Sequence, residues 1–380
     1  MLDPRRTGPL DPACRLTVVI PARNEEARIG AAVTALAKQR DLDGFAVDPR
    51  SFDVIVFCNG CVDTTAARAQ RAAREHPGLA LSVLDASARG FVDVGHARGA
   101  ALDLAARRFL AAGRSSGILA STDADTIVAP DWIAWTLREM RSADAVGGYV
   151  RVSDTARERM LAPLRLIYDR ELAYRRLLGE IEDSLDPRPH DPGPRHDSFV
   201  GASFAVTVAA YIAAGGLPRL SFHEDVAFAR ALDRVDARVR HSYRVRCATS
   251  ARSSGRVVGG FGTFLDDLAR RSERRETLPV RAAAASVECA RARRHLRAAW
   301  SGDEAQYAAG ASLLGIDERR LMSTAREHAT FGSFWQALEP ETRQHTYEDE
   351  PIEDAIAAFR HLLGPSATIE VASANALDTG

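Results

Sequence analysis

The stretch GILASTDADTIVAPDW, residues 117–132, decides the fold: a run of apolar residues in it ends at two aspartates. Residues 117–121 are typical of a buried strand, and a helix is expected to begin near Pro130. In an extended backbone, positions two apart point to the same side, so Asp123 and Asp125 can face one ligand. Their hard oxygens suit Mg²⁺ or Mn²⁺. On its own, however, an Asp-x-Asp pattern more often caps a turn before a helix.

Outward from this stretch, short β-branched or apolar runs alternate with helical patterns. The alternation predicts an α/β fold with a mostly parallel, Rossmann-like sheet flanked by helices. Strands are expected at residues 16–20, 53–57, 80–84, 117–121, 145–150, 203–206 and 239–245. A helix is expected directly after the first strand, with Asn24 suited to its N-cap.

The rest of the chain is expected to be helical or irregular. An amphipathic pattern between Asp154 and Asp183 predicts a packed helix. Residues 186–197 contain four prolines and one glycine, which predicts an irregular loop. The predicted organisation is a flexible tail over 1–14, an α/β domain over 15–260, and a mostly helical extension over 261–380 that ends in a loose tail.

A second acidic pair, Glu224 and Asp225, stands immediately before another helical pattern. Ser221 and Glu224 have the capping-box spacing, in which the glutamate bonds back to the amide of the cap residue. Glu224 then has a structural role and Asp225 is available. An aspartate near a helix start keeps its charge easily, which suits a general base that takes a proton from an acceptor hydroxyl.

Other polar residues have two interpretations each. The turn at residues 21–25 follows the first strand at the sheet's ligand edge and could hold a nucleoside. Asp63 either lies near that pocket or caps the helix after it. Arg98 could meet phosphate oxygens or form a surface salt bridge. Residues 249–256 either fold over a diphosphate or form a simple polar loop. His223 is the histidine best placed to be a further metal ligand.

Five segments together carry a family resemblance. They are PARNEEARI from residue 21, CNGCVDTT from 58, STDADTIVAPDW from 121, FVGASFAV from 199 followed by GGLP, and HEDVAFARAL from 223. In this order and at these distances they resemble the family-2 glycosyltransferases of the GT-A fold. The similarity covers about residues 15–260, the expected catalytic domain.

The resemblance implies an inverting glycosyltransferase that uses a nucleotide-diphospho-sugar donor. It implies a divalent metal, Mg²⁺ or Mn²⁺, held through Asp125, with Asp123 near the ribose and the metal. Asp225 would be the base. Arg98 lies in the segment that precedes the metal-binding strand and would face the phosphates.

By the same likeness, Pro21, Arg23 and Glu25 would line the nucleoside pocket, with Asp63 near it on the turn after the second strand. The chain departs from the family at Cys58, where many members carry the aspartate that binds the base. The resemblance therefore selects neither UDP nor GDP.

The composition excludes several other classes. Lys and Arg number 50 and Asp and Glu 51, and no long run of one sign indicates nucleic-acid or membrane-surface binding. Five cysteines make no disulfide framework and fit a reducing compartment, so we expect the cytoplasm. No run of about 18 apolar residues occurs, so no membrane-spanning segment is expected.

Three alternatives stay open beside the inverting transferase. A sugar nucleotidyltransferase would be expected to have a Gly-rich loop and a basic residue after the first strand, where this chain has PARNEE. A nucleotide-sugar-binding scaffold without turnover would leave both acidic pairs without a purpose. A retaining GT-A enzyme is the third. The sequence does not identify the acceptor, whose pocket is expected to involve the proline-rich loop and the C-terminal helices.

Overall fold

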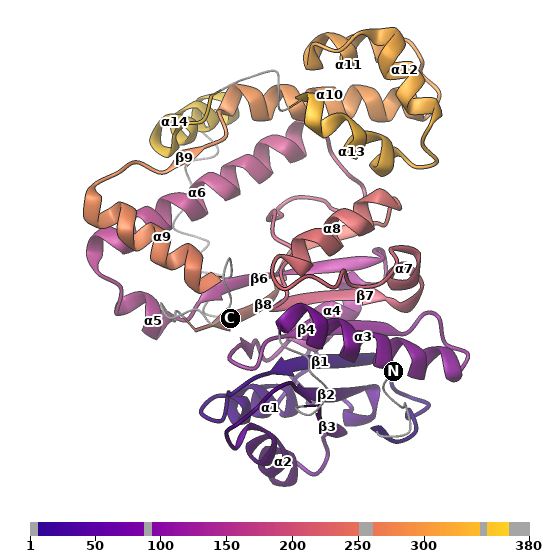
Figure 1. Ribbon diagram of the computed structural model, residues 1–380, viewed down its shortest axis with the longest axis vertical. Coiled ribbons are helices and arrows are strands. Elements are labelled where there is room, and N and C mark those ends of the chain that lie inside the picture. Colours follow the sequence, from indigo (N-terminus) through magenta and orange to yellow (C-terminus); the bar gives the residue numbers. More distant parts are fainter. Residues whose placement is uncertain (1–6, 87–92, 251–260, 343–347, 365–380) are drawn as a thin grey trace. The chain divides into compact units, whose positions relative to one another are not determined.

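The computed structural model describes residues 7–86, 93–250, 261–342 and 348–364, coloured along the sequence in Figure 1. The chain forms two compact units. Unit 1 comprises Met1–Arg159 and Ser198–Asp266, and unit 2 comprises Met160–Asp197 and Asp267–Gly380. Across the described residues, no helix combines the length and the apolar character needed to cross a membrane.

Unit 1 is built on an eight-stranded sheet with the strand order β3-β2-β1-β4-β7-β6-β8-β5. The strands are β1 (Leu16–Ala22), β2 (Phe52–Cys58), β3 (Leu81–Asp85), β4 (Ile118–Thr122), β5 (Ile127–Val128), β6 (Ala145–Val152), β7 (Ser203–Thr207) and β8 (Val239–Thr249). Strands β3, β2, β1 and β4 run parallel, and β6 runs parallel to β8. Strand β7 is antiparallel to β4 and β6, and β5 to β8.

Helices cover both faces of this sheet, which explains the near-continuous apolar strands. All seven residues of β1 are buried. Leu16, Val18 and Ile20 pack in one core with α1, α2 and α4, whereas Val19 packs in a second core with α3, α7 and α8. The helices of unit 1 are α1 (Ile29–Ala37), α2 (Thr65–Glu75), α3 (Val94–Ala111), α4 (Trp132–Glu139), α5 (Asp154–Glu158), α7 (Val208–Ala213), α8 (Glu224–Arg234) and the short η2 (Pro49–Ser51).

In the part of unit 2 that the structure describes, the regular elements are helices and one short antiparallel strand pair. The long helix α6 packs against α10 and α14, and α10 also packs against α11 and α13. Two apolar cores result, one around Tyr174 and Phe359 and the other around Leu296 and Phe334. The elements are α6 (Ala162–Leu185), β9 (Pro279–Val280), α10 (Ala283–Trp300), α11 (Gln306–Leu314), α12 (Glu318–Arg326), α13 (Phe331–Thr342), β10 (Glu350–Pro351) and α14 (Ile352–Leu363); α9 (Phe261–Arg274) begins in unit 1 and ends in unit 2.

The predicted α/β class is confirmed, and each expected strand is present within a few residues. Two helix predictions are wrong in detail. The first helix begins at Ile29 instead of near Asn24, whose φ of 54° is left-handed. The pattern from Asp154 forms two helices, because the chain turns before Pro163 and starts α6 there.

The proline-rich loop at residues 186–197 is irregular, as predicted. By packing, α6 and this loop group with the C-terminal helices, although the sequence predicts them within the α/β domain over 15–260. Their association follows from apolar positions of α6 that face α14 and α10. The expected tail at 1–14 is described only from residue 7, and the end of the chain from residue 365 lies outside the described residues.

Candidate active site

The parallel strands β1, β2 and β4 end at the same edge of the sheet, which is where ligands bind in open α/β sheets. The turn after β1 carries Arg23 and Glu25, and the turn after β2 carries Asp63. Asp123 and Asp125 follow β4. The topology therefore gathers three of the sequence motifs at one edge.

A buried arginine joins the two acidic motifs. Arg98, on α3, is 3% exposed, and its Nη2 donates to Asp123 Oδ1 at 2.8 Å. Its Nε donates to Glu224 Oε1 at 3.1 Å. Its Nη1 donates to Ser121 Oγ at 2.5 Å and to the carbonyl of Gly201 at 2.8 Å. One guanidinium thus fixes the end of β4 and the start of α8 together.

Charge is concentrated around this guanidinium. Burial alone would lower the pKa of Arg98, but Asp123 and Glu224 raise it above its ordinary value. Burial raises the pKa of Asp123; Arg98 opposes this, and repulsion from Asp125 and Asp225 adds to it. The pKa of Glu224 is raised by burial, against the effect of Arg98. Three acids, Asp123, Glu224 and Asp225, therefore act on one buried cation, and Asp125 acts on Asp123.

Asp225 is half-buried at the first turn of α8. Its Oδ2 accepts a hydrogen bond from the backbone N–H of Gly201 at 2.8 Å, and its Oδ1 accepts one from Val226 N–H at 2.8 Å. The preceding residue, His223, has a φ of 57°, a sparsely populated conformation for a residue with a side chain. The carboxylate is held in one orientation and each oxygen keeps a free lone pair.

Asp125 lies in the same cluster as Asp225, since both carboxylates act on the charge of Asp123. Its Oδ2 accepts a hydrogen bond from Ser250 Oγ at 2.5 Å. Ser250 is the last described residue of the polar segment at 249–256, whose remaining residues lie outside the described part of the chain. The segment therefore starts beside the acidic motif.

The turns after β1 and β2 are tied to each other. Glu25 N–H donates to Thr65 Oγ1 at 2.7 Å, and Glu26 N–H donates to Asp63 Oδ2 at 3.2 Å. Asp63 also accepts from Thr65 N–H at 3.0 Å. Asp63 therefore supports the start of α2 and links it to the turn after β1, whereas its part in a nucleoside site stays a prediction.

The other predicted residues of this turn differ in exposure. Arg23 is exposed at the sheet edge, whereas Pro21 is buried inside β1 opposite Phe57. Pro21 therefore belongs to the buried strand, and its part in a nucleoside site stays a prediction. Cys58, where the family pattern is broken, is buried at the end of β2.

Two interpretations of the sequence are corrected. Glu224 does not complete a capping box, because α8 begins at Glu224 itself and Ser221 Oγ donates to Asp93. The surface salt bridge considered for Arg98 is wrong, and its donors are directed to protein acceptors instead of outward to phosphates. The buried pair of Arg98 and Glu224 satisfies both side chains.

Sequence reasoning missed the role of Gly201 in this site. A Cβ at this position would lie 2.6 Å from Nη2 of Arg98, closer than real contacts allow. The residue must be glycine for the guanidinium to reach its partners. The FVGASFAV segment contains this glycine, but the clash is visible only once Arg98 is placed beside it.

The residues fit a divalent cation that is coordinated partly by protein carboxylates and partly by a bound phosphate compound. Among the described residues, no three His, Cys, Asp or Glu side chains are grouped to hold a metal by themselves. Mg²⁺ commonly takes one or two carboxylates and completes its shell with phosphate oxygens and water. Asp123 is one-third exposed, and the mutual repulsion of the acids favours a cation there. His223, the histidine suggested as a further metal ligand, is likewise not part of a group of three such side chains among the described residues.

The mostly parallel sheet with helices on both faces is the fold class predicted from the sequence, and its ligand edge carries the acidic motifs. A sequence model described as "Glycosyltransferase like family 2" matches residues 12–259, and the chain belongs to this family. The predicted family and fold are thereby confirmed, and the chain is a glycosyltransferase by family. A search of curated protein sequences found no match.

Solved structures with a similar arrangement have low sequence identity to this chain. One is the mannosyltransferase PcManGT from Pyrobaculum calidifontis in complex with GDP-Man and Mn²⁺, at 18% identity, 88% coverage of each chain and a TM-score of 0.44. Another is TarS residues 1–349 from S. aureus in complex with UDP-GlcNAc, at 16% identity, 88% coverage of this chain and 93% of that one, and a TM-score of 0.43.

Proposed function

We propose that this glycosyltransferase is inverting and metal-dependent, and that it moves a sugar from a nucleotide diphosphate to an acceptor hydroxyl. The observation that carries the proposal is the contact of the buried Arg98 with both Asp123 and Glu224, which brings the motif of Asp123 and Asp125 close to Asp225. Direct displacement needs one group at the leaving diphosphate and another at the attacking hydroxyl. The two acidic motifs supply both from one cluster.

Asp123 and Asp125 would hold the divalent metal, either Mg²⁺ or Mn²⁺, with the diphosphate completing its coordination. When bound, the ion neutralises the charge that develops on the departing nucleotide diphosphate. Asp123 keeps its place through Arg98, and Asp125 through Ser250. Both carboxylates are therefore oriented before a ligand arrives.

Asp225 would act as the general base and take the proton of the acceptor hydroxyl as the new bond forms. The N–H groups of Gly201 and Val226 hold its carboxylate in place without occupying every lone pair. Arg98 would touch no reacting atom. It is a positioning residue, because it fixes the start of α8 through Glu224.

The nucleoside would lie against the joined turns after β1 and β2, between Arg23, Glu25 and Asp63, with Pro21 beneath. The hydrogen bonds from Glu25 and Glu26 across to the second turn make this one continuous surface. The position supports the proposal because it lies at the same sheet edge as the acidic motifs.

Ligand-dependent melting tests this proposal. UDP or GDP should raise the melting temperature only when Mg²⁺ or Mn²⁺ is present. At a ligand concentration a hundredfold above Kd, binding should add about 2.7 kcal/mol to the free energy of unfolding. Asp125→Asn should remove the metal-dependent part of the shift. As a matched control, Asp43→Asn changes an exposed turn residue and should keep the full shift. A shift that is independent of the metal in every variant would contradict the proposal.

A further inference from the structure

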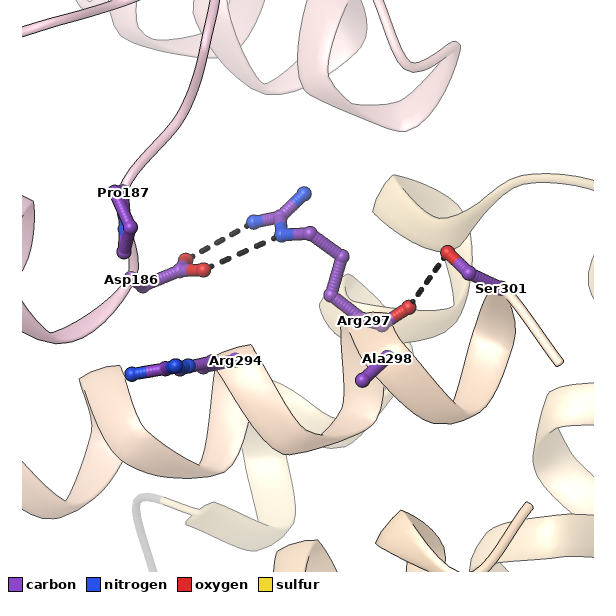
Figure 2. A pocket seen from close by; sticks show the side chains of 6 residues that line it. All are labelled: Asp186, Pro187, Arg294, Arg297, Ala298 and Ser301. Carbon is purple, nitrogen blue, oxygen red and sulfur yellow. Dashed lines mark hydrogen bonds and ion pairs between the residues drawn. The ribbon is translucent and has the colours of Figure 1, made fainter. Parts of the chain in front are cut away.

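Unit 2 contains a pocket of about 240 Å³ at the end of α6 and along the last turns of α10, shown in Figure 2. It is lined by Asp186, Pro187, Arg294, Arg297, Ala298 and Ser301. Arg297 and Ala298 lie three and four residues after Arg294 on α10, so one helix face forms one wall. Sites for drug-sized ligands usually span about 300–1,000 Å³. This pocket therefore suits a small chemical group.

The acid in the pocket is already neutralised. Asp186 is 5% exposed and accepts two hydrogen bonds from Arg297, from Nη2 at 3.0 Å and from Nε at 3.3 Å. This paired geometry is the strong form of a carboxylate–guanidinium contact. Figure 2 shows the two groups facing each other. Asp186 therefore fixes Arg297 and leaves no uncompensated negative charge.

Two further arginines add positive charge. Arg294 is exposed and has no hydrogen bond or ion pair with any residue that the structure describes. Arg188 has a buried Nε without a hydrogen-bond partner in the described chain. Its nearest acid is Asp186, at 3.9 Å, which already serves Arg297. The pocket and its immediate surroundings thus carry more cations than anions.

The neighbouring arginines repel Arg188. Its pKa is lowered to about 10, first by burial and then by Arg293, Arg195 and Arg297. Arg195 has Asp191 and Glu182 beside it and is balanced by them. Arg188 still carries its charge at neutral pH, so the repulsion is present in the folded protein.

The partial negative charge at the C-terminus of α10 repels an anion only weakly. Carbonyl groups at a helix C-terminus carry about half a negative charge, which favours cations such as Arg294 and Arg297. Ser301 Oγ donates to the carbonyl of Arg297 and so satisfies one of these groups. Half a charge is smaller than the two positive charges that remain beside the Asp186–Arg297 pair.

We propose that this pocket binds a phosphate group, which Arg294 and Arg297 contact and the charge of Arg188 attracts. Planar guanidinium donors match phosphate oxygens in geometry, and a dianion balances two cations. The phosphate could be free or could belong to a small phosphate monoester. The inference concerns unit 2 alone and does not depend on the proposed transfer reaction.

Isothermal titration of the full chain with inorganic phosphate, glycerol phosphate and acetate tests the proposal. Arg294→Gln should raise the Kd for phosphate about tenfold or more, since one charge-assisted contact is lost. Arg294 is exposed, so the variant should fold. Arg291→Gln removes an exposed charge from the same helix outside the pocket and should leave the Kd unchanged.

The three titrants distinguish the possible ligands. Binding of inorganic phosphate alone identifies free phosphate as the ligand, and tighter binding of glycerol phosphate identifies a monoester. The absence of phosphate binding, an equal Kd in both variants, or acetate binding as tight as that of phosphate would overturn the proposal. Asp225→Asn should bind phosphate normally, so failure of the proposed transfer reaction would not mimic failure of this site.

Discussion

Nε of Arg98 lies 3.1 Å from Oε1 of Glu224, across 126 residues of sequence, and both side chains are buried. The same guanidinium holds Asp123 at 2.8 Å. The first turn of α8 is therefore tied to the end of β4. This relationship sets the position of Asp225 beside the Asp-x-Asp motif, and several measurable consequences follow from it.

Replacing Arg98 should destabilise the protein strongly. Arg98→Gln leaves Glu224 without its buried cation and takes one partner from Asp123. Breaking one side of a buried pair typically costs about 3–5 kcal/mol. Urea denaturation would measure the difference in the free energy of unfolding.

A surface pair provides the control for this measurement. Arg238 pairs with Asp144, and the side chains are 54% and 31% exposed. Arg238→Gln should therefore cost no more than about 1 kcal/mol. If the two substitutions had equal effects, Arg98 would not have the positioning role described here.

Gly201→Ala should disturb the same network by steric overlap. The added methyl group would lie 2.6 Å from Nη2 and 2.7 Å from Cζ of Arg98. Overpacking of this kind costs about 1–3 kcal/mol, and turnover should fall with it because Gly201 N–H also holds Asp225. Calorimetry and a transfer assay would measure both effects.

Gly30→Ala is the matched control for this substitution. Gly30 lies within α1, and a Cβ there would meet nothing within 4 Å. Alanine is the better helix former, so this variant should gain about 0.5–1 kcal/mol. Loss of stability at Gly201 with a gain at Gly30 is the expected pattern; equal losses would argue against a specific clash.

The ionisation of Asp123 should make stability depend on pH. Its pKa is raised in the folded protein, mainly by burial, so the folded chain binds this proton more tightly than the unfolded chain does. Ionisation then opposes folding increasingly as the pH rises from about 4 through the folded pKa. The stability of Asp123→Asn relative to the native chain should therefore increase over this range, as urea denaturation at several pH values would show.

Asp48 serves as the comparison, because its effect on stability should change with pH in the opposite direction. Hydrogen bonds from the side chain and backbone of Arg50 lower the pKa of this exposed carboxylate. The native chain should therefore gain stability relative to Asp48→Asn as the pH rises. If both differences moved in the same direction, the environment assigned to Asp123 would be wrong.

Much of the sheet could be predicted from the sequence because central strands such as β1 and β2 are buried on both faces. Residues 16–20 (LTVVI) and 53–57 (DVIVF) are almost entirely apolar or β-branched, and helical patterns between such runs indicate parallel pairing. The position of α6 could not be predicted. Its amphipathic pattern predicts that one face is buried, but the pattern does not indicate that α10 and α14 are the helices that bury it.

The acids of the candidate site and Arg98 could be named from the sequence, but the pairing between them could not. Asp123, Asp125 and Asp225 stand in recognisable local patterns. The spacing of Ser221 and Glu224 predicts a capping box, so it gives no indication that Glu224 pairs with Arg98 on α3. A buried pair formed across the fold leaves no spacing signal, and the need for glycine at residue 201 depends on that pair.

The most direct test compares sugar transfer with donor binding in Asp225→Asn, assayed with nucleotide-sugar donors and a panel of acceptor alcohols in the presence of Mn²⁺. The substitution keeps the size of the side chain but removes the proton acceptor. We expect transfer to fall by a factor of about 10²–10⁴ or more while the Kd of the donor stays within a few fold of the native value. Near-normal transfer by this variant would contradict the account.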